Sequence, residues 1–304
     1  MSEIVVIGSL NMDLSIRVPR IPLPGETISG ENLVTSAGGK GANQAAACAN
    51  LGSQVTMIGA VGQDDFGRRM KEGLRKVGIS VSFIQENPGV PSGTAMIMVD
   101  AAGENVIVLS AGANSYVVID RNAEELIRNA KILLLQLEIP TDIVFRSIKI
   151  ANDAGVPVLL NPAPAIALPN EIYSRIDYLI PNEIEASILS GVEVKDIASA
   201  EKAAGILLDR GVKTVIITLG ANGAFLASGN NRHAIPAMKI NPVDTTGAGD
   251  AFIGGFAAAI VEGKPLEEAL HYATAAGALA ATKAGAQSSL PSRQELEQFV
   301  KLRV

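Results

Sequence analysis

The chain has 304 residues, of which 48% are hydrophobic and 18% are charged. This balance is typical of a packed globular enzyme and argues against a disordered chain. The net charge of −6 and the lack of a basic run argue against nucleic-acid binding. The one cysteine, Cys48, cannot form an internal disulfide, which fits a reducing compartment. Its Ala-rich neighbours predict that its side chain is buried.

Two further features predict a cytoplasmic protein without a membrane anchor. The first residues, Met1-Ser2-Glu3-Ile4, lack the basic and long apolar regions of a signal peptide. The longest nearly uncharged apolar stretch, residues 251–261, is too short to span a bilayer, which takes roughly 20 residues.

Short aliphatic runs alternate along the chain with stretches of helical length. The runs predict buried strands at residues 4–7, 55–58, 132–135, 156–160, 178–180 and 215–218. The intervening stretches predict helices at residues 40–51, 66–77, 121–129, 142–153, 198–210 and 249–262. Several of these helices end at a plausible glycine stop, such as Gly52 or Gly155. We therefore expect an α/β fold in which helices cover both faces of a mostly parallel sheet.

Two segments interrupt this alternation. Residues 11–36 are Pro-rich and alternate polar with apolar side chains, and residues 88–110 contain two further alternating runs. Both segments predict hairpin strands inserted into the α/β core. Because ligands of such sheets lie beyond the carboxyl ends of the strands, the inserted strands could form a small β-sheet lid. With no internal repeat or linker, we expect a single α/β domain over residues 1–304.

Residues 242–252 carry the strongest chemical signal. Two closely spaced glycines, Gly247 and Gly249, lead into an apolar helix. The free N–H groups and the positive dipole end of such a helix form an anion site. Asp250, in the first turn, then has two interpretations. It compensates the helix dipole, or it acts as the general base that phosphoryl transfer needs beside the bound phosphate. The residues alone favour neither.

Common phosphate-binding motifs do not explain the chain. A Walker A loop fails around Gly39-Lys40, because Val34 stands in place of its first glycine and Gly41 in place of its Ser or Thr. A dinucleotide fingerprint fails because Phe252 occupies its third glycine position. These departures argue against a P-loop enzyme and an NAD-dependent dehydrogenase.

Two more segments combine polar side chains with glycines. In residues 36–45, Lys40 and Asn43 lie near a helix start where glycines let the backbone approach a ligand, although a flexible loop is the alternative. Asn11 and Asp13 are two residues apart in an extended segment and so face the same side. They could bind neighbouring hydroxyls, and a simple turn is equally consistent with the pattern.

In order and spacing, these segments together resemble the ribokinase/PfkB family of carbohydrate kinases. The resemblance runs from Ile4 to Phe299 and rests on two signatures, Gly-Gly-Lys-Gly-Ala-Asn-Gln-Ala at residues 38–45 and the segment 244–250. It implies the three-layer α/β/α ribokinase-like fold with a small β-sheet lid. It also implies an ATP-dependent kinase that phosphorylates the 5-hydroxyl of D-ribose.

The resemblance assigns catalytic and sugar-binding roles. Asp250 would deprotonate the sugar hydroxyl, and the backbone amides of Ala248, Gly249 and Asp250 would form an anion hole for the γ-phosphate at the helix start 247–250, where Gly247 completes the catalytic set. A second set would bind the sugar: Asn11, Asp13, Gly39, Lys40, Asn43, Glu138 and Asp250. Asp13 and Glu138 suit this role because ionised acceptors form the stronger hydrogen bonds.

A third set of residues would bind the nucleotide and Mg²⁺. The resemblance assigns ATP binding to Asn182, Thr218, Gly220, Gly223, Gly249 and Thr274. Without the resemblance, residues 218–223 predict a turn between two strands. Asn182 and Glu185 match the family's Asn-x-x-Glu element, in which Glu185 would bind Mg²⁺ through water. Taken alone, these two residues predict a capped helix start.

Members of this family also bind a monovalent cation beside the anion hole. Mostly carbonyl oxygens would hold K⁺ here, from Asp244, Thr246, Ala280, Lys283, Gly285 and Ser289. The lid of such proteins also pairs with the lid of a second subunit, which implies a homodimer, and unpaired strand edges favour such pairing. The two histidines, His233 and His271, argue against a histidine metal site or triad.

Two alternatives to a ribose kinase remain open. A kinase for deoxyribose, fructose, another sugar or a nucleoside would share Asp250 and the anion hole, although an aromatic content of 4% argues mildly against stacking on a nucleobase. A non-catalytic sugar or nucleotide sensor would need no base, so Asp250 argues against it.

Overall fold

The computed structural model describes residues 3–302. In this part of the chain, nine strands form a central sheet in which neighbouring strands are parallel, except that the strand Ala224–Ser228 is antiparallel to both of its neighbours. From one edge to the other these are β13 (Asn231–Ile235), β12 (Ala224–Ser228), β11 (Thr214–Thr218), β10 (Tyr178–Leu179), β9 (Val158–Leu160), β8 (Ile132–Leu135), β1 (Ile4–Ile7), β4 (Val55–Gly62) and β5 (Ser80–Asn87).

Helices cover both faces of this sheet, because its strands are apolar on both sides. Val5 and Ile7 of β1 pack into one core, and Ile4 and Val6 pack into the other. The first core is closed by α3 (Arg121–Arg128), α4 (Thr141–Asp153), α5 (Asn170–Tyr173), α6 (Glu183–Ser190) and α7 (Ile197–Asp209). The second is closed by α1 (Lys40–Asn50), α2 (Asp65–Lys76), α8 (Ala248–Val261) and α9 (Leu266–Ala280), with α10 (Arg293–Lys301) packed outside them.

Local sequence signals set the helix ends. Asp64, Asp120 and Asp196 cap α2, α3 and α7, since each side chain accepts a backbone N–H from the first turn. The glycines expected to stop helices all have a positive φ, namely Gly52, Gly78, Gly155 and Gly211.

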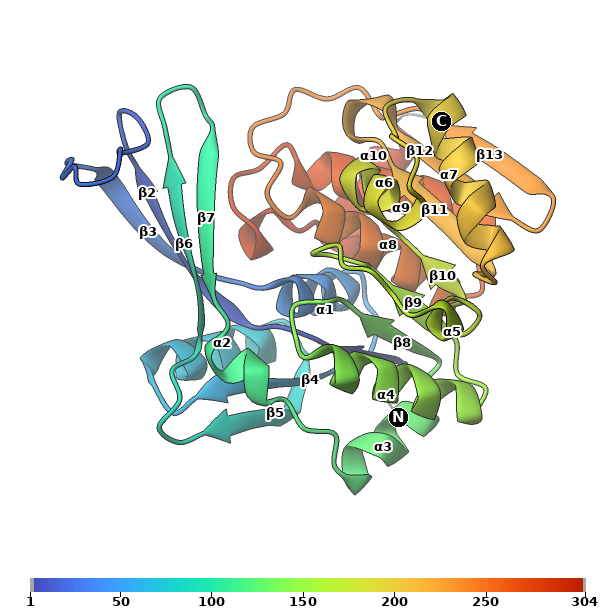
Figure 1. Cartoon of the computed structure of the whole chain (residues 1–304), viewed down its shortest axis with the longest axis horizontal. Helices are drawn as coiled ribbons and strands as arrows, with labels where there is room; N and C mark the ends of the chain where they lie inside the picture. Colours follow the sequence, from blue (N-terminus) through green and yellow to red (C-terminus); the bar gives the residue numbers. More distant parts are fainter. Residues whose placement is uncertain (1–2, 303–304) are drawn as a thin grey trace.

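A second, four-stranded sheet stands apart from the main body at the upper left of Figure 1. Its order is β3 (Glu31–Gly38), β2 (Asn11–Arg17), β6 (Gly93–Val99) and β7 (Asn105–Ser110). The register aligns Asp13 with Ala95, and Ala95 with Leu109, so these three residues share one face. The neighbouring row, with Met96 and Val108, lies on the opposite face.

The fold agrees with the sequence analysis, since the three layers and the inserted small sheet are both present. The predicted helices and strands match to within one or two residues at most ends, and β4 extends to Gly62. Sequence reasoning did not place β5, β12, β13, α5 or α10. Short 3₁₀ turns complete the structure: η1 (Gly112–Tyr116), η2 (Gly220–Asn222) and η3 (Gln287–Ser289). Among residues 3–302, none of the helices combines the length and apolarity needed to cross a bilayer.

Candidate active site

Polar residues, some of them predicted from the sequence, gather beyond the carboxyl ends of the parallel strands. Ser9 follows β1, Glu138 follows β8, and Asn161 follows β9. Asn182 follows β10 and forms an isolated bridge with Thr218 at the end of β11. Because β4 and β8 flank β1 on opposite sides, the strand order reverses beside this point, where open α/β sheets bind their ligands.

The start of α8 faces this edge. Gly247 caps the helix in the left-handed conformation, with φ 78°, and within residues 3–302 no side chain caps the helix start by a hydrogen bond. The N–H of Ala248 donates to the carbonyl of Thr245 at 3.1 Å. Of the three amides expected in the anion hole, those of Gly249 and Asp250 thus remain best placed to receive a phosphate oxygen.

Asp250 receives hydrogen bonds from α1. The Nδ2 of Asn43 donates to Oδ2 of Asp250 at 2.9 Å, and Nε2 of Gln44 donates to Oδ1 at 2.9 Å. Burial raises the pKa of Asp250, while the charge of Lys40 and these two donors oppose the rise. The carboxylate is therefore held in a fixed orientation and kept more basic than an exposed aspartate.

The sugar-binding residues predicted from sequence converge beside Asp250. Glu138 accepts the Ser9 hydroxyl at 2.6 Å and the Lys40 backbone N–H at 3.2 Å. Burial, together with the negative charges of Glu138 and Asp250, raises the pKa of Asp13 to about 6. This electrostatic coupling places the three carboxyl groups in one site.

Two glycines make room for these side chains. A Cβ on Gly38 would lie 2.1 Å from Oδ2 of Asp13, and a Cβ on Gly39 would lie 2.7 Å from the Asn11 nitrogen. Gly39 also has φ 91°, which disfavours other residues. Asn11 is held in place by Asn114, whose Nδ2 donates to Oδ1 of Asn11 at 2.8 Å. The backbone can therefore approach a ligand beside Asn11 and Asp13.

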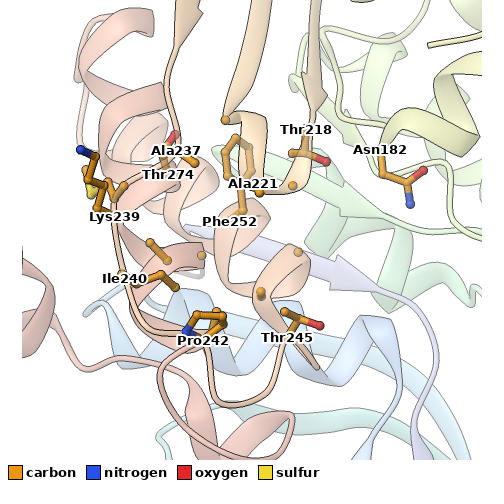
Figure 2. A pocket seen from close by; sticks show the side chains of 18 of the residues that line it. Asn182, Thr218, Ala221, Ala237, Lys239, Ile240, Pro242, Thr245, Phe252 and Thr274 are labelled. Carbon is orange, nitrogen blue, oxygen red and sulfur yellow. The ribbon is translucent and has the colours of Figure 1, made fainter. Parts of the chain in front are cut away.

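A cavity of about 590 Å³ lies between the start of α8 and the loops that follow β11 and β13. Figure 2 shows Asn182 and Thr218 at one side of it, Lys239 and Ile240 at the other, and Phe252 between them. Every residue of the predicted nucleotide set lines the cavity: Asn182, Thr218, Gly220, Gly223, Gly249 and Thr274. Its walls are mostly apolar, which suits a flat aromatic base.

A second cavity, of about 240 Å³, connects the first with the sugar-binding residues. Lys40 and Asp250 line it, and so does Glu185. The two cavities share Asn182, Thr218, Thr245 and Gly249. A ligand in the larger cavity could therefore extend an anionic tail to Asp250.

Both interpretations of Asn182 and Glu185 find support. They form a capping box at the start of α6, with Asn182 accepting the Glu185 N–H at 2.8 Å and Glu185 Oε2 accepting the Asn182 N–H at 2.9 Å. Both residues also line the smaller cavity. Burial raises the pKa of Glu185, and the hydrogen bond from Asn182 opposes the rise.

The residues predicted to hold a monovalent cation come from two segments joined by Asp244. Its carboxylate accepts the N–H of Thr246 at 2.9 Å and the N–H of Gly285 at 2.8 Å. Burial would raise the pKa of Asp244, but these donors hold it below its usual value. The Nζ of Lys283 lies 2.6 Å from Oε1 of Glu295, so the charge of Lys283 is paired with a carboxylate outside the loop.

Sequence reasoning missed four polar residues of this site. Gln44 and Asn161 are buried next to Asp250, Thr245 lines both cavities, and Asn114 orients Asn11. Gln44 lies inside the signature 38–45, which was the available signal. Thr245 likewise lies inside the signature 244–250, whereas Asn114 and Asn161 are single polar residues that carry no local pattern.

Comparison with known proteins identifies the family of the chain. Residues 1–293 match the pfkB family of carbohydrate kinases. The chain is 45% identical over 299 residues to a ribokinase of Haemophilus influenzae, covering 98% of both proteins. It is 38% identical over 304 residues to a deoxyribokinase of Salmonella typhimurium, covering 99% of both.

A solved structure confirms the fold. The ribokinase of Arabidopsis thaliana, complexed with ribose and ATP, superposes with a TM-score of 0.93 at 37% identity over 99% of both chains. A match over nearly the whole chain includes the small sheet as well as the central one. This protein is therefore a kinase that belongs to the pfkB family of carbohydrate kinases.

Proposed function

We propose that the protein transfers the γ-phosphoryl group of ATP to the 5-hydroxyl of D-ribose, giving D-ribose 5-phosphate and ADP. The observation that carries this proposal is the position of Asp250. Its carboxylate lines the smaller cavity beside the Gly249 amide, which lines both cavities. A base and an anion-binding helix start thus lie together where the nucleotide-sized cavity meets the smaller one, beside the residues that would bind the sugar.

Residues of this chain supply each part of the transfer. An oxygen of Asp250 takes the proton from the sugar hydroxyl while the oxygen attacks the γ-phosphorus and the bond to ADP breaks. Both carboxylate oxygens already accept one N–H, and each retains a lone pair for the hydroxyl. The amides of Gly249 and Asp250 and the amine of Lys40 stabilise the charge that spreads over the transferred group.

The sugar would be held by hydroxyl-binding groups from three parts of the fold. Asn11 and Asp13 project from β2, Lys40 and Asn43 from α1, and Glu138 from the segment after β8. Asn43 supports this role in a specific way: its Nδ2 binds Asp250, whereas its buried Oδ1 has no partner among residues 3–302. A sugar hydroxyl donating to Oδ1 would satisfy this acceptor.

The nucleotide would occupy the larger cavity with its phosphates toward α8. Gly220 and Gly223 form the turn between β11 and β12, both with positive φ, so the backbone there can approach the nucleotide closely. Thr274 donates its hydroxyl to the Leu270 carbonyl at 2.9 Å, so its methyl group is the part available for apolar contact.

Mg²⁺ fits the acidic side of the smaller cavity. The capping box engages Oε2 of Glu185, so Oε1 can accept from a water bound to the metal. When bound, Mg²⁺ would supply positive charge that neutralises the phosphate groups. Asn182 and Glu185 would orient its waters, and a positive charge beside Glu185 would offset the cost of burying its carboxylate.

K⁺ fits the loop pair joined by Asp244. The carboxylate is used to fix the backbone of Thr246 and Gly285, which leaves carbonyl oxygens as the ligands that suit a large monovalent ion. The full set would be Asp244, Thr246, Ala280, Lys283, Gly285 and Ser289. These residues would fix the loop that precedes α8 and so the anion hole itself.

The small sheet would act as a lid and as the contact of a homodimer. Asp13 and Leu109 share the face that would cover the sugar, since the register aligns both with Ala95. On the opposite face Met96 is 58% exposed and Val108 is 56% exposed. Both outer strands, β3 and β7, also have an unpaired edge within the described chain. A second copy of this lid would bury that apolar surface and pair those edges.

Three observations support ribose over the alternatives. The polar set of Asn11, Asp13 and Glu138 suits a small polyhydroxyl sugar, and the H. influenzae and A. thaliana relatives are ribokinases. Deoxyribose remains the nearest alternative, because the S. typhimurium relative is a deoxyribokinase. We place the enzyme in the cytoplasm, where ATP is available and where a lone buried thiol such as Cys48 stays reduced.

The experiment that tests this function is ADP release from Mg-ATP over a panel of sugars and nucleosides, in K⁺ and then in Na⁺. We expect the highest kcat/KM with D-ribose and a higher rate in K⁺. Higher kcat/KM with deoxyribose or fructose would discard the ribose assignment and keep the mechanism. If the folded protein turns over none of these compounds, the result would favour a non-catalytic sugar or nucleotide sensor.

A further inference from the structure

Three buried amide side chains form a chain of hydrogen bonds that ends on Asp250. Gln136 Nε2 donates to Gln44 Oε1 at 2.6 Å. Gln44 Nε2 donates to Asp250 Oδ1 at 2.9 Å and to Asn161 Oδ1 at 3.1 Å. Asn161 Nδ2 donates to the Ile180 carbonyl at 2.9 Å. Gln44 and Gln136 are fully buried, and Asn161 is 6% exposed.

The Ile180 carbonyl fixes the direction of the whole chain, because it can only accept. Asn161 must therefore turn its amide NH₂ group to the Ile180 carbonyl and its amide oxygen to Gln44. Gln44 must then donate from its amide NH₂ group to Asn161, and its amide oxygen accepts from Gln136. As a consequence, the remaining Nε2 proton of Gln44 points at Asp250 whatever the charge on that carboxyl.

The end of the chain supports this direction. Gln136 Oε1 is buried and has no partner within residues 3–302. Leaving a buried acceptor unpaired is costly. Turning Gln136 around would bring its oxygen against the oxygen of Gln44, which is worse. The protein thus keeps an unpaired acceptor at one end, and a donor faces Asp250 at the other.

We propose that Gln44 is a positioning residue for the reaction, which holds Oδ1 of Asp250 by an obligatory N–H donor so that the free lone pairs face the sugar hydroxyl. This inference rests on the proposed role of Asp250 as the base. Gln44 itself lies behind Asp250: it does not line either cavity, and among its contacts Asp250 is the group nearest the reacting atoms.

The same donor also sets when Asp250 is ionised. Charged groups face Asp250 from four parts of the fold: Lys40 on α1, Asp13 on β2, Glu138 after β8 and Glu185 on α6. Three of these are carboxyls, and Lys40 is the cation that opposes them. Hydrogen bonds from Asn43 and Gln44 therefore share with Lys40 the task of keeping Asp250 ionised despite its burial.

Two substitutions of Gln44 test the proposal. Gln44→Met keeps the shape and removes the donor, and Gln44→Glu keeps the shape and adds a carboxyl. For both we expect kcat with D-ribose to fall about 10–100-fold with little change in the KM for ATP. Because losing the donor destabilises the ionised form, the acid limb of the kcat–pH profile should move to higher pH. A purely structural residue would not move that limb.

Two controls separate the possible outcomes. Ser147→Ala removes another fully buried polar side chain, which bonds within its own helix to Ile143, and should leave both kcat and the limb unchanged. If Asp250→Asn retains the wild-type kcat, the proposed function fails. If Asp250→Asn is inactive while folded Gln44→Met keeps the wild-type kcat and acid limb, the positioning role is overturned. Should Gln44→Met not fold, the same readout on Gln44→Glu decides.

Discussion

Asn43 donates to Asp250 across 207 residues of sequence, with 2.9 Å between Nδ2 and Oδ2. The bond joins the start of α1 to the start of α8. Farther along the same helices, Gly254 of α8 packs on Ala47 of α1 so closely that a Cβ on Gly254 would lie 2.3 Å from the Ala47 Cβ. The distance between the two helices therefore affects the geometry of the Asp250 carboxylate, the proposed base.

Gly254→Ala should push α8 away from α1 and so weaken the Asn43–Asp250 bond. We expect the free energy of unfolding to fall by about 1–3 kcal/mol and kcat to fall with it. Gly205→Ala, in α7, has open space around the new methyl group and should stabilise the protein by about 0.5–1 kcal/mol. Urea denaturation and kcat measure both. Equal effects of the two substitutions would show that the α1–α8 spacing does not set the site.

The sequence predicted those parts of the fold that carry a local pattern. Solid apolar runs such as Val5–Val6 identify buried parallel strands, and glycines such as Gly52 identify helix ends. The strand β5 (Ser80–Asn87) was missed because it lies at the sheet edge and ends in three polar residues, Gln85–Asn87, so it has no solid apolar run. The turn at residues 218–223 implied a strand after it but gave no bounds for β12, and β13 was missed because it begins with three polar residues, Asn231–His233.

The candidate site was predicted where its residues lie in glycine-rich signatures or match another family element, as Glu138 and Glu185 do. Asp250, Lys40 and Asn43 were found in this way. Gln44 and Asn161 could not be assigned roles, since each acts through partners more than 100 residues away in sequence. Their function depends on which strands are neighbours in space, and no local pattern encodes that.

Asp13→Asn should alter stability in a pH-dependent way. The pKa of Asp13 is raised from 3.8 to about 6, so between these values the folded protein retains a proton that the unfolded chain has lost. Its ionisation therefore destabilises the fold as pH rises through this window, and has no effect on stability below it.

In the absence of sugar, we expect Asp13→Asn to raise the free energy of unfolding by about 1–3 kcal/mol near pH 7.5, and by less near pH 4.5. Glu31→Gln, at an exposed carboxyl of the neighbouring strand, is the control and should change little. Urea denaturation at the two pH values measures the difference. A gain that is equal at both pH values would contradict the raised pKa of Asp13.

Gly223→Ala should disrupt the turn that shapes the nucleotide cavity. Gly223 has φ 93°, and a Cβ there would lie 2.0 Å from the Ile235 carbonyl oxygen. We expect a loss of at least about 3 kcal/mol in stability and a higher KM for ATP. Gly229→Ala is the matched control: its φ is also positive, at 52°, but its surroundings are open, so it should cost about 1 kcal/mol and leave the KM unchanged.

Val108→Lys should abolish the proposed homodimer. Val108 is 56% exposed on the face of the lid that points away from Asp13, and a lysine there would be buried against a second subunit. Ile184→Lys, at a side chain 70% exposed on α6, is the control for added charge. In sedimentation experiments we expect dimers for the wild type and Ile184→Lys, and monomers for Val108→Lys. A dimer that survives Val108→Lys would place the contact elsewhere.

Asp250→Asn tests the central claim most directly, because it keeps the size and burial of the side chain and removes the base. The measurement is kcat with Mg-ATP and D-ribose, beside calorimetric titration of D-ribose into the same protein. We expect kcat to fall by about 10²–10⁴-fold while D-ribose still binds. A kcat within twofold of the wild type, in protein that binds D-ribose, would contradict the assignment of Asp250 as the base.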